Sequence, residues 1–175
     1  VLGVTARGSD LEQALKQAYR VVDTIHWEGK TFRRDIGVKG MKYDRGGRPE
    51  KSVTILIGSQ SDAPVAKKAT AILAEFDVGY RLFVSSAHRN PEGTRKIIHD
   101  AEEEGVEVFI AMAGMAAHLP GVLAAETTKP VIGVPIEAKM DGLDALLAIA
   151  QMPPGIPVSA MATNGGLNAG LAAIE

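Results

Sequence analysis

Residues 53–62, which read VTILIGSQSD, decide the fold class of this 175-residue chain. Five consecutive apolar or β-branched residues are typical of a strand buried on both faces of a sheet, and a glycine with small polar residues ends it before a helix near Pro64. Three more such runs follow, at Arg81–Val84, Val108–Ala113 and Val131–Val134. Helical stretches separate them, at about 64–76, 91–104, 116–126, 142–151 and from about 166 onward. The alternation predicts a parallel sheet within a three-layer α/β/α, flavodoxin-like domain over residues 52–175.

The first 37 residues have a different pattern. A strand at Val1–Thr5, a helix over 10–26 and a strand at Phe32–Ile36 are expected there. Ser9 and Glu12 have the spacing of a capping box, which favours a helix start at this point. A strand-helix-strand segment of this size buries little apolar surface alone, so we expect it to need a partner.

Residues 38–51 lack hydrophobic periodicity and are rich in glycine and charge, as in VKGMKYDRGGRPEK. This composition is typical of a linker. The sequence therefore predicts three parts: a small segment at 1–37, a linker at 38–51 and the α/β domain at 52–175.

Composition excludes several classes of protein. The formal net charge of −2 gives no overall attraction for nucleic acid or an anionic membrane. The absence of cysteine excludes disulfides and a thiol nucleophile, and it suits a reducing cytoplasm. No apolar run reaches the length of a membrane span, and no signal peptide opens the sequence. We therefore expect a soluble, cytoplasmic globular protein.

The loops after the strands are where a ligand is expected, because parallel α/β sheets bind ligands beyond the carboxyl ends of their strands. After the first strand, Gly58, Ser59, Ser61 and Asp62 lead into a helix, and hydroxyls beside helix-initial amides suit a phosphate. Asp62 either caps that helix or binds ribose hydroxyls. The alternative is that Ser61 and Asp62 are only helix caps.

The loop after the second strand places His88 beside Arg89. Histidine titrates near neutrality and exchanges a proton within a turnover, while arginine binds an anion. The alternative is a surface histidine in a polar loop. His118, after the third strand, lies among Ala, Leu and Pro and is interpreted as a structural, hydrogen-bonded histidine. His26 and His99 receive no catalytic role, and no spacing indicates a metal site.

Five motifs, in order, make the resemblance specific. They are GSQSD (58–62), SAHR (86–89), AGMAAHLPG (113–121), PVIGVP (130–135) and QMP (151–153). Over residues 52–175 the chain resembles the phosphoribosylaminoimidazole carboxylase catalytic subunit family, whose bacterial form is called N5-carboxyaminoimidazole ribonucleotide mutase. The resemblance implies de novo purine biosynthesis with no metal, ATP or organic cofactor.

Site residues carry over from the resemblance by position. His88 would be the catalytic acid–base. The substrate-binding residues would be Ser59, Ser61, Asp62, Ser86, Ala87, Arg89, Gly114 and Leu119. The family commonly forms a homo-octamer with its sites at subunit junctions, so the implied partners are the aminoimidazole ribonucleotide, CO2 and further copies of the chain.

Within the family, Arg89 and residues 117–121 are similar to the mutase class rather than to the class that uses free CO2. The implied reaction converts N5-carboxyaminoimidazole ribonucleotide to the 4-carboxy isomer. A carboxylase using free CO2 and an inactive nucleotide-binding module are the alternatives. The chain departs from the family pattern at Ala63, Asn90 and Met115, where tryptophan, threonine and glycine are usual, and at EAKM (137–140).

The N-terminal segment resembles a different enzyme. VLGVTA (1–6), IHWEG (25–29) and FRRDIG (32–37) are similar to the carboxyl-terminal end of glycinamide ribonucleotide synthetase. The catalytic core of that ligase is absent from this sequence, so no ligase activity is expected. The resemblance suggests a fusion of two purine-pathway enzymes, with residues 1–37 as a remnant of the upstream one.

Overall fold

The computed structural model describes residues 3–34, 36 and 52–175. The chain divides into two compact units, Val1–Arg48 and Pro49–Glu175. The predicted linker at 38–51 lies outside the described residues.

In the described part of the first unit, residues Leu11–Thr24 form helix α1. The expected Ser9 cap is wrong, because the Asp10 carboxylate accepts the hydrogen bond from the Gln13 amide at 2.7 Å. Ser9 instead donates its hydroxyl to Asp10 at 2.9 Å. The helix ends before His26, where Lys30 donates to the carbonyl oxygens of the last turn.

The two strands expected beside this helix are absent among the described residues, since 3–8 and 30–33 have extended or irregular backbone without a ladder. No residue of α1 is buried. Its apolar side chains line a groove of about 750 Å³ together with Trp27 and Phe32. The expectation that this segment buries little surface by itself agrees with this open groove.

The second unit is a parallel sheet of five strands in the order β2-β1-β3-β4-β5. The strands are β1 (Val53–Ile57), β2 (Tyr80–Val84), β3 (Val108–Gly114), β4 (Val131–Ile136) and β5 (Ser159–Ala160). This is the flavodoxin-like strand order, which confirms the predicted fold class. The four predicted strands are present, and the short β5 was not predicted.

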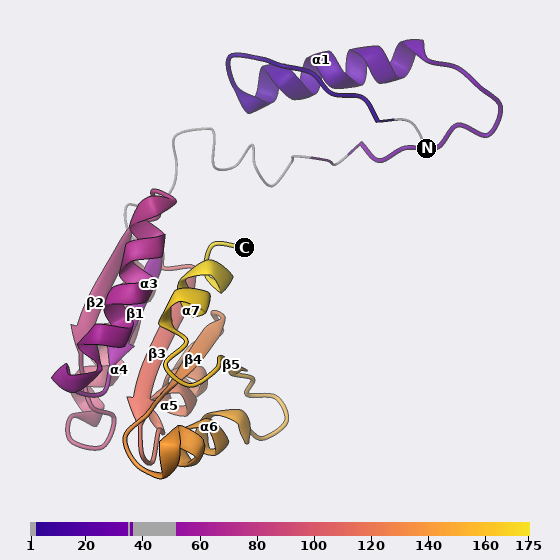
Figure 1. Ribbon diagram of the computed structural model, residues 1–175. Helices are drawn as coiled ribbons and strands as arrows, with labels where there is room; N and C mark the ends of the chain where they lie inside the picture. Colours follow the sequence, from indigo (N-terminus) through magenta and orange to yellow (C-terminus); the bar gives the residue numbers. More distant parts are fainter. Residues whose placement is uncertain (1–2, 35, 37–51) are drawn as a thin grey trace. The chain divides into compact units, whose positions relative to one another are not determined.

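Helices cover both faces of this sheet. They are α3 (Ala63–Glu75), α4 (Pro91–Glu103), α5 (Leu119–Glu126), α6 (Leu143–Ala150) and α7 (Gly166–Ala172). Helices α3 and α7 lie together on one face, and α4, α5 and α6 pack on the other (Figure 1). Short 3₁₀ helices, η1 (Gln60–Asp62) and η2 (Met140–Gly142), precede α3 and α6.

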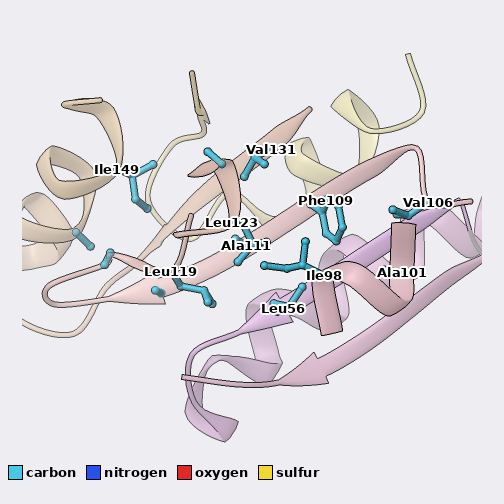
Figure 2. Close-up of a cluster of buried hydrophobic side chains, with 14 residues drawn as sticks. Leu56, Ile98, Ala101, Val106, Phe109, Ala111, Leu119, Leu123, Val131 and Ile149 are labelled. Atoms are coloured by element: carbon cyan, nitrogen blue, oxygen red, sulfur yellow. The ribbon is translucent and has the colours of Figure 1, made fainter. Parts of the chain in front are cut away.

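Two hydrophobic clusters fill the spaces on either side of the sheet. In the first, Phe109 and Leu56 from the strands meet Ile98, Leu123 and Ile149 from the helices (Figure 2). The second lies under α3 and α7 and includes the other faces of β1 and β3. Both faces of the central strands are therefore buried, as the continuous apolar runs predicted.

Strand β2 is the exception to that prediction. It lies at the edge of the sheet, and Tyr80, Leu82 and Val84 are 37%, 42% and 52% exposed. The apolar sequence predicts a strand buried on both faces, and this prediction is wrong for the face of β2 that carries these three side chains. No helix in the described ranges is long and apolar enough to cross a membrane.

The strand order creates a crevice between β1 and β3. Helix α3 follows β1 on one face of the sheet, and α5 follows β3 on the opposite face. The two loops therefore diverge from the carboxyl ends of neighbouring strands. A crevice at such a switch point is the usual ligand site of this fold.

Candidate active site

The loop after β1 is held by reciprocal hydrogen bonds between its ends. The Ser59 amide donates to the Asp62 carboxylate at 3.1 Å, and the Ser59 hydroxyl oxygen accepts from the Ser61 amide at 3.4 Å. The Ser61 hydroxyl also donates to Asp62 at 3.0 Å. Asp62 therefore organises this loop, and it makes no side-chain cap bond to α3.

Asp62 is 6% exposed, and this burial raises the pKa of its carboxyl above the ordinary value of 3.8. Hydrogen bonds from the Ser61 hydroxyl and from the backbone at Ser59 and Gly58 oppose the rise in pKa. Because the pKa is higher in the folded state, the contribution of this group to stability falls as pH rises through its titration.

Asp62→Asn should therefore gain stability relative to the parent protein as pH rises from about 3 to about 7. The asparagine oxygen still accepts from the Ser59 amide, so the loop keeps its main bond. Urea unfolding at a series of pH values measures the difference in unfolding free energy. A difference that does not change with pH would contradict this prediction.

The loop after β2 forms a tight turn that presents His88 and Arg89. The Asn90 amide donates to the Ser86 carbonyl at 2.8 Å, and the Arg89 amide reaches the Ser86 hydroxyl at 3.4 Å. The Arg89 guanidinium donates to the Gly58 carbonyl at 3.4 Å, which links this loop to the β1 loop.

Asn90, at a position where the resemblance implies threonine, has a defined structural role. Its side-chain oxygen accepts from the Gly93 amide at 3.2 Å and so caps α4, with Pro91 at the first helical position. Asparagine is among the best capping residues, so this departure supports the turn that carries His88.

His118 lies against His88, where the sequence did not place it. His88 Nε2 is 2.9 Å from His118 Nδ1, and the rings meet edge to face with centroids 4.9 Å apart. His118 is exposed and comes from the loop between β3 and α5. It is hydrogen-bonded as expected, but its partner is the proposed acid–base. The signal that could have placed it is its position after β3, the strand that lies next to β1.

A single hydrogen occupies the bond between these two rings, because two protonated nitrogens cannot face each other at this distance. The tautomer of one imidazole therefore sets that of the other. A coupled pair of this kind can give and take one proton, which is the property expected of an acid–base centre.

A pocket of about 470 Å³ opens between these three loops. Every residue predicted for the site lines it: Ser59, Ser61, Asp62, Ser86, Ala87, His88, Arg89, Gly114 and Leu119. The structure adds Gly58, Ala113, Met115, Ala116, His118 and Ala138. A larger hollow of about 760 Å³ at the opposite end of the sheet contains none of the predicted residues. The residues predicted for the site are therefore gathered in the smaller pocket.

Met115, at the rim of this pocket, has left-handed backbone with φ of 56° and is 54% exposed. This conformation is costly for residues with a side chain and free for glycine. The glycine that the resemblance implies at this position would carry no such cost, and methionine occupies it here under strain.

Comparison with known proteins tests the two resemblances. Residues 52–175 match the AIR carboxylase family, and residues 1–39 match the C domain of phosphoribosylglycinamide synthetase. Both resemblances expected from the sequence are thus confirmed.

Similar proteins agree with the family match. An N5-carboxyaminoimidazole ribonucleotide mutase of Pyrococcus abyssi is 56% identical over 124 residues, which are 70% of this chain and 71% of the relative. One of Methanocaldococcus jannaschii is 53% identical over 123 residues, 70% of this chain and 76% of the relative. The crystal structure of Treponema denticola PurE has a TM-score of 0.64 at 26% identity, covering 69% of this chain and 76% of that one. The chain therefore belongs to the AIR carboxylase family.

Proposed function

We propose that this protein is an N5-carboxyaminoimidazole ribonucleotide mutase of purine biosynthesis. The observation that carries the proposal is the pocket lined by His88, Arg89 and the β1 loop, in a chain that is 56% and 53% identical to two relatives of that name over 124 and 123 residues. The pocket volume of about 470 Å³ suits a mononucleotide, since small-molecule sites span about 300–1,000 Å³.

The nucleotide phosphate or its carboxylate would bind Arg89 and the hydroxyls of Ser59 and Ser61. The three groups come from two loops that the bond from Arg89 to the Gly58 carbonyl already joins. Charge-assisted bonds from a guanidinium fix an anion in both distance and angle. Asp62, Ser86, Ala87, Gly114 and Leu119 would complete the substrate contacts.

His88 would act first as an acid and then as a base. Protonated His88 gives its proton to N5 while the N5–carboxylate bond breaks, which leaves aminoimidazole ribonucleotide and CO2. Ring carbon C4 then attacks CO2 and forms the new carbon–carbon bond. Neutral His88 removes the C4 proton, which restores the aromatic ring and the protonated histidine. One proton thus returns to its starting place, and the step is a net isomerisation.

Two features of the pocket support this chemistry. The 2.9 Å bond between His88 Nε2 and His118 Nδ1 couples the tautomers of the two rings and orients the ring of the acid–base. The walls at Ala87, Ala116 and Gly114 are small, which leaves space for CO2 beside a flat ring. Retention of CO2 in a closed site favours its recapture over its escape.

The test is an assay of the purified chain on the N5-carboxylated nucleotide, and on aminoimidazole ribonucleotide with and without bicarbonate. Conversion of the first to the 4-carboxy product without bicarbonate is expected. Turnover only of the second, and only with bicarbonate, would make the protein a carboxylase that uses free CO2. Binding without turnover of either would make it an inactive nucleotide-binding module.

We also propose that the chain assembles as a homo-octamer with its sites at subunit junctions, as its resemblance implies. The exposed apolar edge at Tyr80, Leu82 and Val84 supports an interface, since large apolar side chains on an edge strand favour association. Sedimentation of the purified chain measures the assembly, and a monomer would contradict it.

We propose that residues 1–37 correspond to the end of glycinamide ribonucleotide synthetase and that residues 38–51 link them to the enzyme at 52–175. The match at 1–39 and the uncovered apolar face of α1 support this proposal. Deletion of residues 1–51 should leave turnover unchanged, whereas loss of turnover would contradict it. The cytoplasmic location expected from the sequence stays a prediction.

A further inference from the structure

The segment that follows β4 forms one wall of the pocket. Ala138 in this segment lines the pocket. A Cβ atom added to Gly114, at the end of β3, would lie 3.2 Å from the Ala138 Cβ and 3.0 Å from the Ile136 carbonyl oxygen. The segment after β4 therefore packs directly against the backbone of Gly114, which lines the pocket.

The same segment has unusual backbone. Three successive residues are left-handed, with φ of 47° at Met140, 54° at Asp141 and 79° at Gly142. Two of these residues carry side chains, for which this conformation costs free energy. Strained backbone of this kind persists only where surrounding contacts hold it.

Asn164, from the turn before α7, supplies such contacts. Its side-chain oxygen accepts from the Glu137 amide at 3.1 Å, and its side-chain nitrogen donates to the Glu137 carboxylate at 3.0 Å. Its own amide donates to the Pro135 carbonyl at 2.8 Å. The two side-chain bonds fix the orientation of the amide, because a carboxylate only accepts and a backbone amide only donates.

We propose that Asn164 and Glu137 form a clamp that positions the Ala138 wall and so retains CO2 between the two halves of the reaction. Neither clamp residue lines the pocket, so both are positioning residues that act through Ala138. The proposal rests on the proposed mutase function and adds the part of the chain that closes the site. Glu137 belongs to the stretch where this chain departs from the family pattern.

The clamp makes a prediction that general destabilisation does not. A loosened wall lets CO2 escape after the N5–carboxylate bond breaks, so the enzyme releases aminoimidazole ribonucleotide in place of the 4-carboxy product. Once the spontaneous loss of CO2 from the substrate, measured without enzyme, is subtracted, the ratio of these two products is independent of how much enzyme is folded. The ratio therefore distinguishes a displaced Ala138 wall from a general loss of protein stability.

Asn164→Asp is the variant that breaks the clamp, since it sets two carboxylates against each other. We expect the ratio of released to carboxylated nucleotide to rise by about five- to tenfold, the scale of one lost hydrogen bond and the repulsion that replaces it. Glu137→Gln keeps both bonds and should retain the parent ratio. The double variant Asn164→Asp with Glu137→Gln should restore it, because the glutamine amide donates to the new carboxylate.

Two further variants complete the design. Asn164 has left-handed backbone, with φ of 58°. Asn164→Gly removes both side-chain bonds of the clamp and also removes the free-energy cost of this conformation. A raised product ratio in this variant therefore comes from the lost hydrogen bonds and not from backbone strain. Asn168→Asp, on an exposed position of α7, introduces the same charge outside the clamp and should retain the parent ratio. An unchanged ratio in Asn164→Asp, or an equally raised ratio in Asn164→Asp and in the double variant, would overturn the proposal.

Hydrogen exchange tests the clamp without any turnover. The backbone amides of residues 137–142 should exchange faster in Asn164→Asp than in the parent, and the double variant should restore their protection. If the parent protein fails to convert the N5-carboxylated nucleotide, the proposed function fails while this measurement still decides the clamp. Unchanged exchange in Asn164→Asp would overturn the clamp whatever the activity.

Discussion

His88→Asn should lower turnover of the N5-carboxylated nucleotide by about 10²–10⁴-fold, the range typical of losing a general acid–base. Asparagine is polar and smaller than histidine, so it fits the same turn, but it cannot give or take a proton at neutral pH. The nucleotide should still bind, because Arg89 and the β1 loop are unchanged. Initial rates measure the first effect, and calorimetric titration with the product nucleotide measures the second.

His99→Asn is the matched control for this variant. His99 is an exposed histidine on α4 that does not line the pocket. Its replacement should leave both the rate and the affinity at the parent values. If His88→Asn retained parent turnover, His88 would not be the acid–base, and His118 would be the remaining histidine of the pocket.

Phe109→Ala should lower the free energy of unfolding by about 3–5 kcal/mol, the cost typical of emptying an aromatic position in a core. Phe109 is fully buried on β3 and packs with Leu56 and Ile98 between the sheet and α4 (Figure 2). The neighbouring strands restrict collapse around the cavity. Urea unfolding followed by circular dichroism measures the loss, since the single tryptophan, Trp27, lies in the other unit.

Phe76→Ala removes the same side chain from the end of α3, where the residue is 49% exposed. It should cost clearly less, because large losses come from buried positions. Equal losses in the two variants would mean that Phe109 does not anchor the cluster.

The parallel sheet was predictable because its central strands are buried on both faces. Such strands have continuous apolar or β-branched sequences, and every residue of β1 and β4 is buried. Strand β5 was not predictable, since its two residues, Ser159 and Ala160, are exposed and pair only with β4. The alternating exposure of β2 depends on its edge position, which composition does not record.

The predicted residues of the pocket came from their positions after the strands and from the family resemblance, and the structure brings them to one place. The position of His118 depends on strand order, because β3 pairs with β1 although β2 lies between them in the sequence. The cap of α1 was misassigned by one residue, since Ser9 and Asp10 are both good caps and only geometry chooses between them. The strands expected beside α1 lack a partner strand in the described residues, and a strand without a ladder has no hydrogen bonds to stabilise it.

The strand order also sets what happens while the chain is being synthesised. Strand β1 leaves the ribosome first, and β2, β3, β4 and β5 each pair with a strand that already exists. Protection from protease should therefore rise stepwise in ribosome-bound chains that end after β2, β3 and β4, and a single late rise would contradict this. A sheet that grows outward from its first strand leaves no strand waiting for a partner encoded far downstream, which limits the time that unpaired apolar edges face the crowded cell.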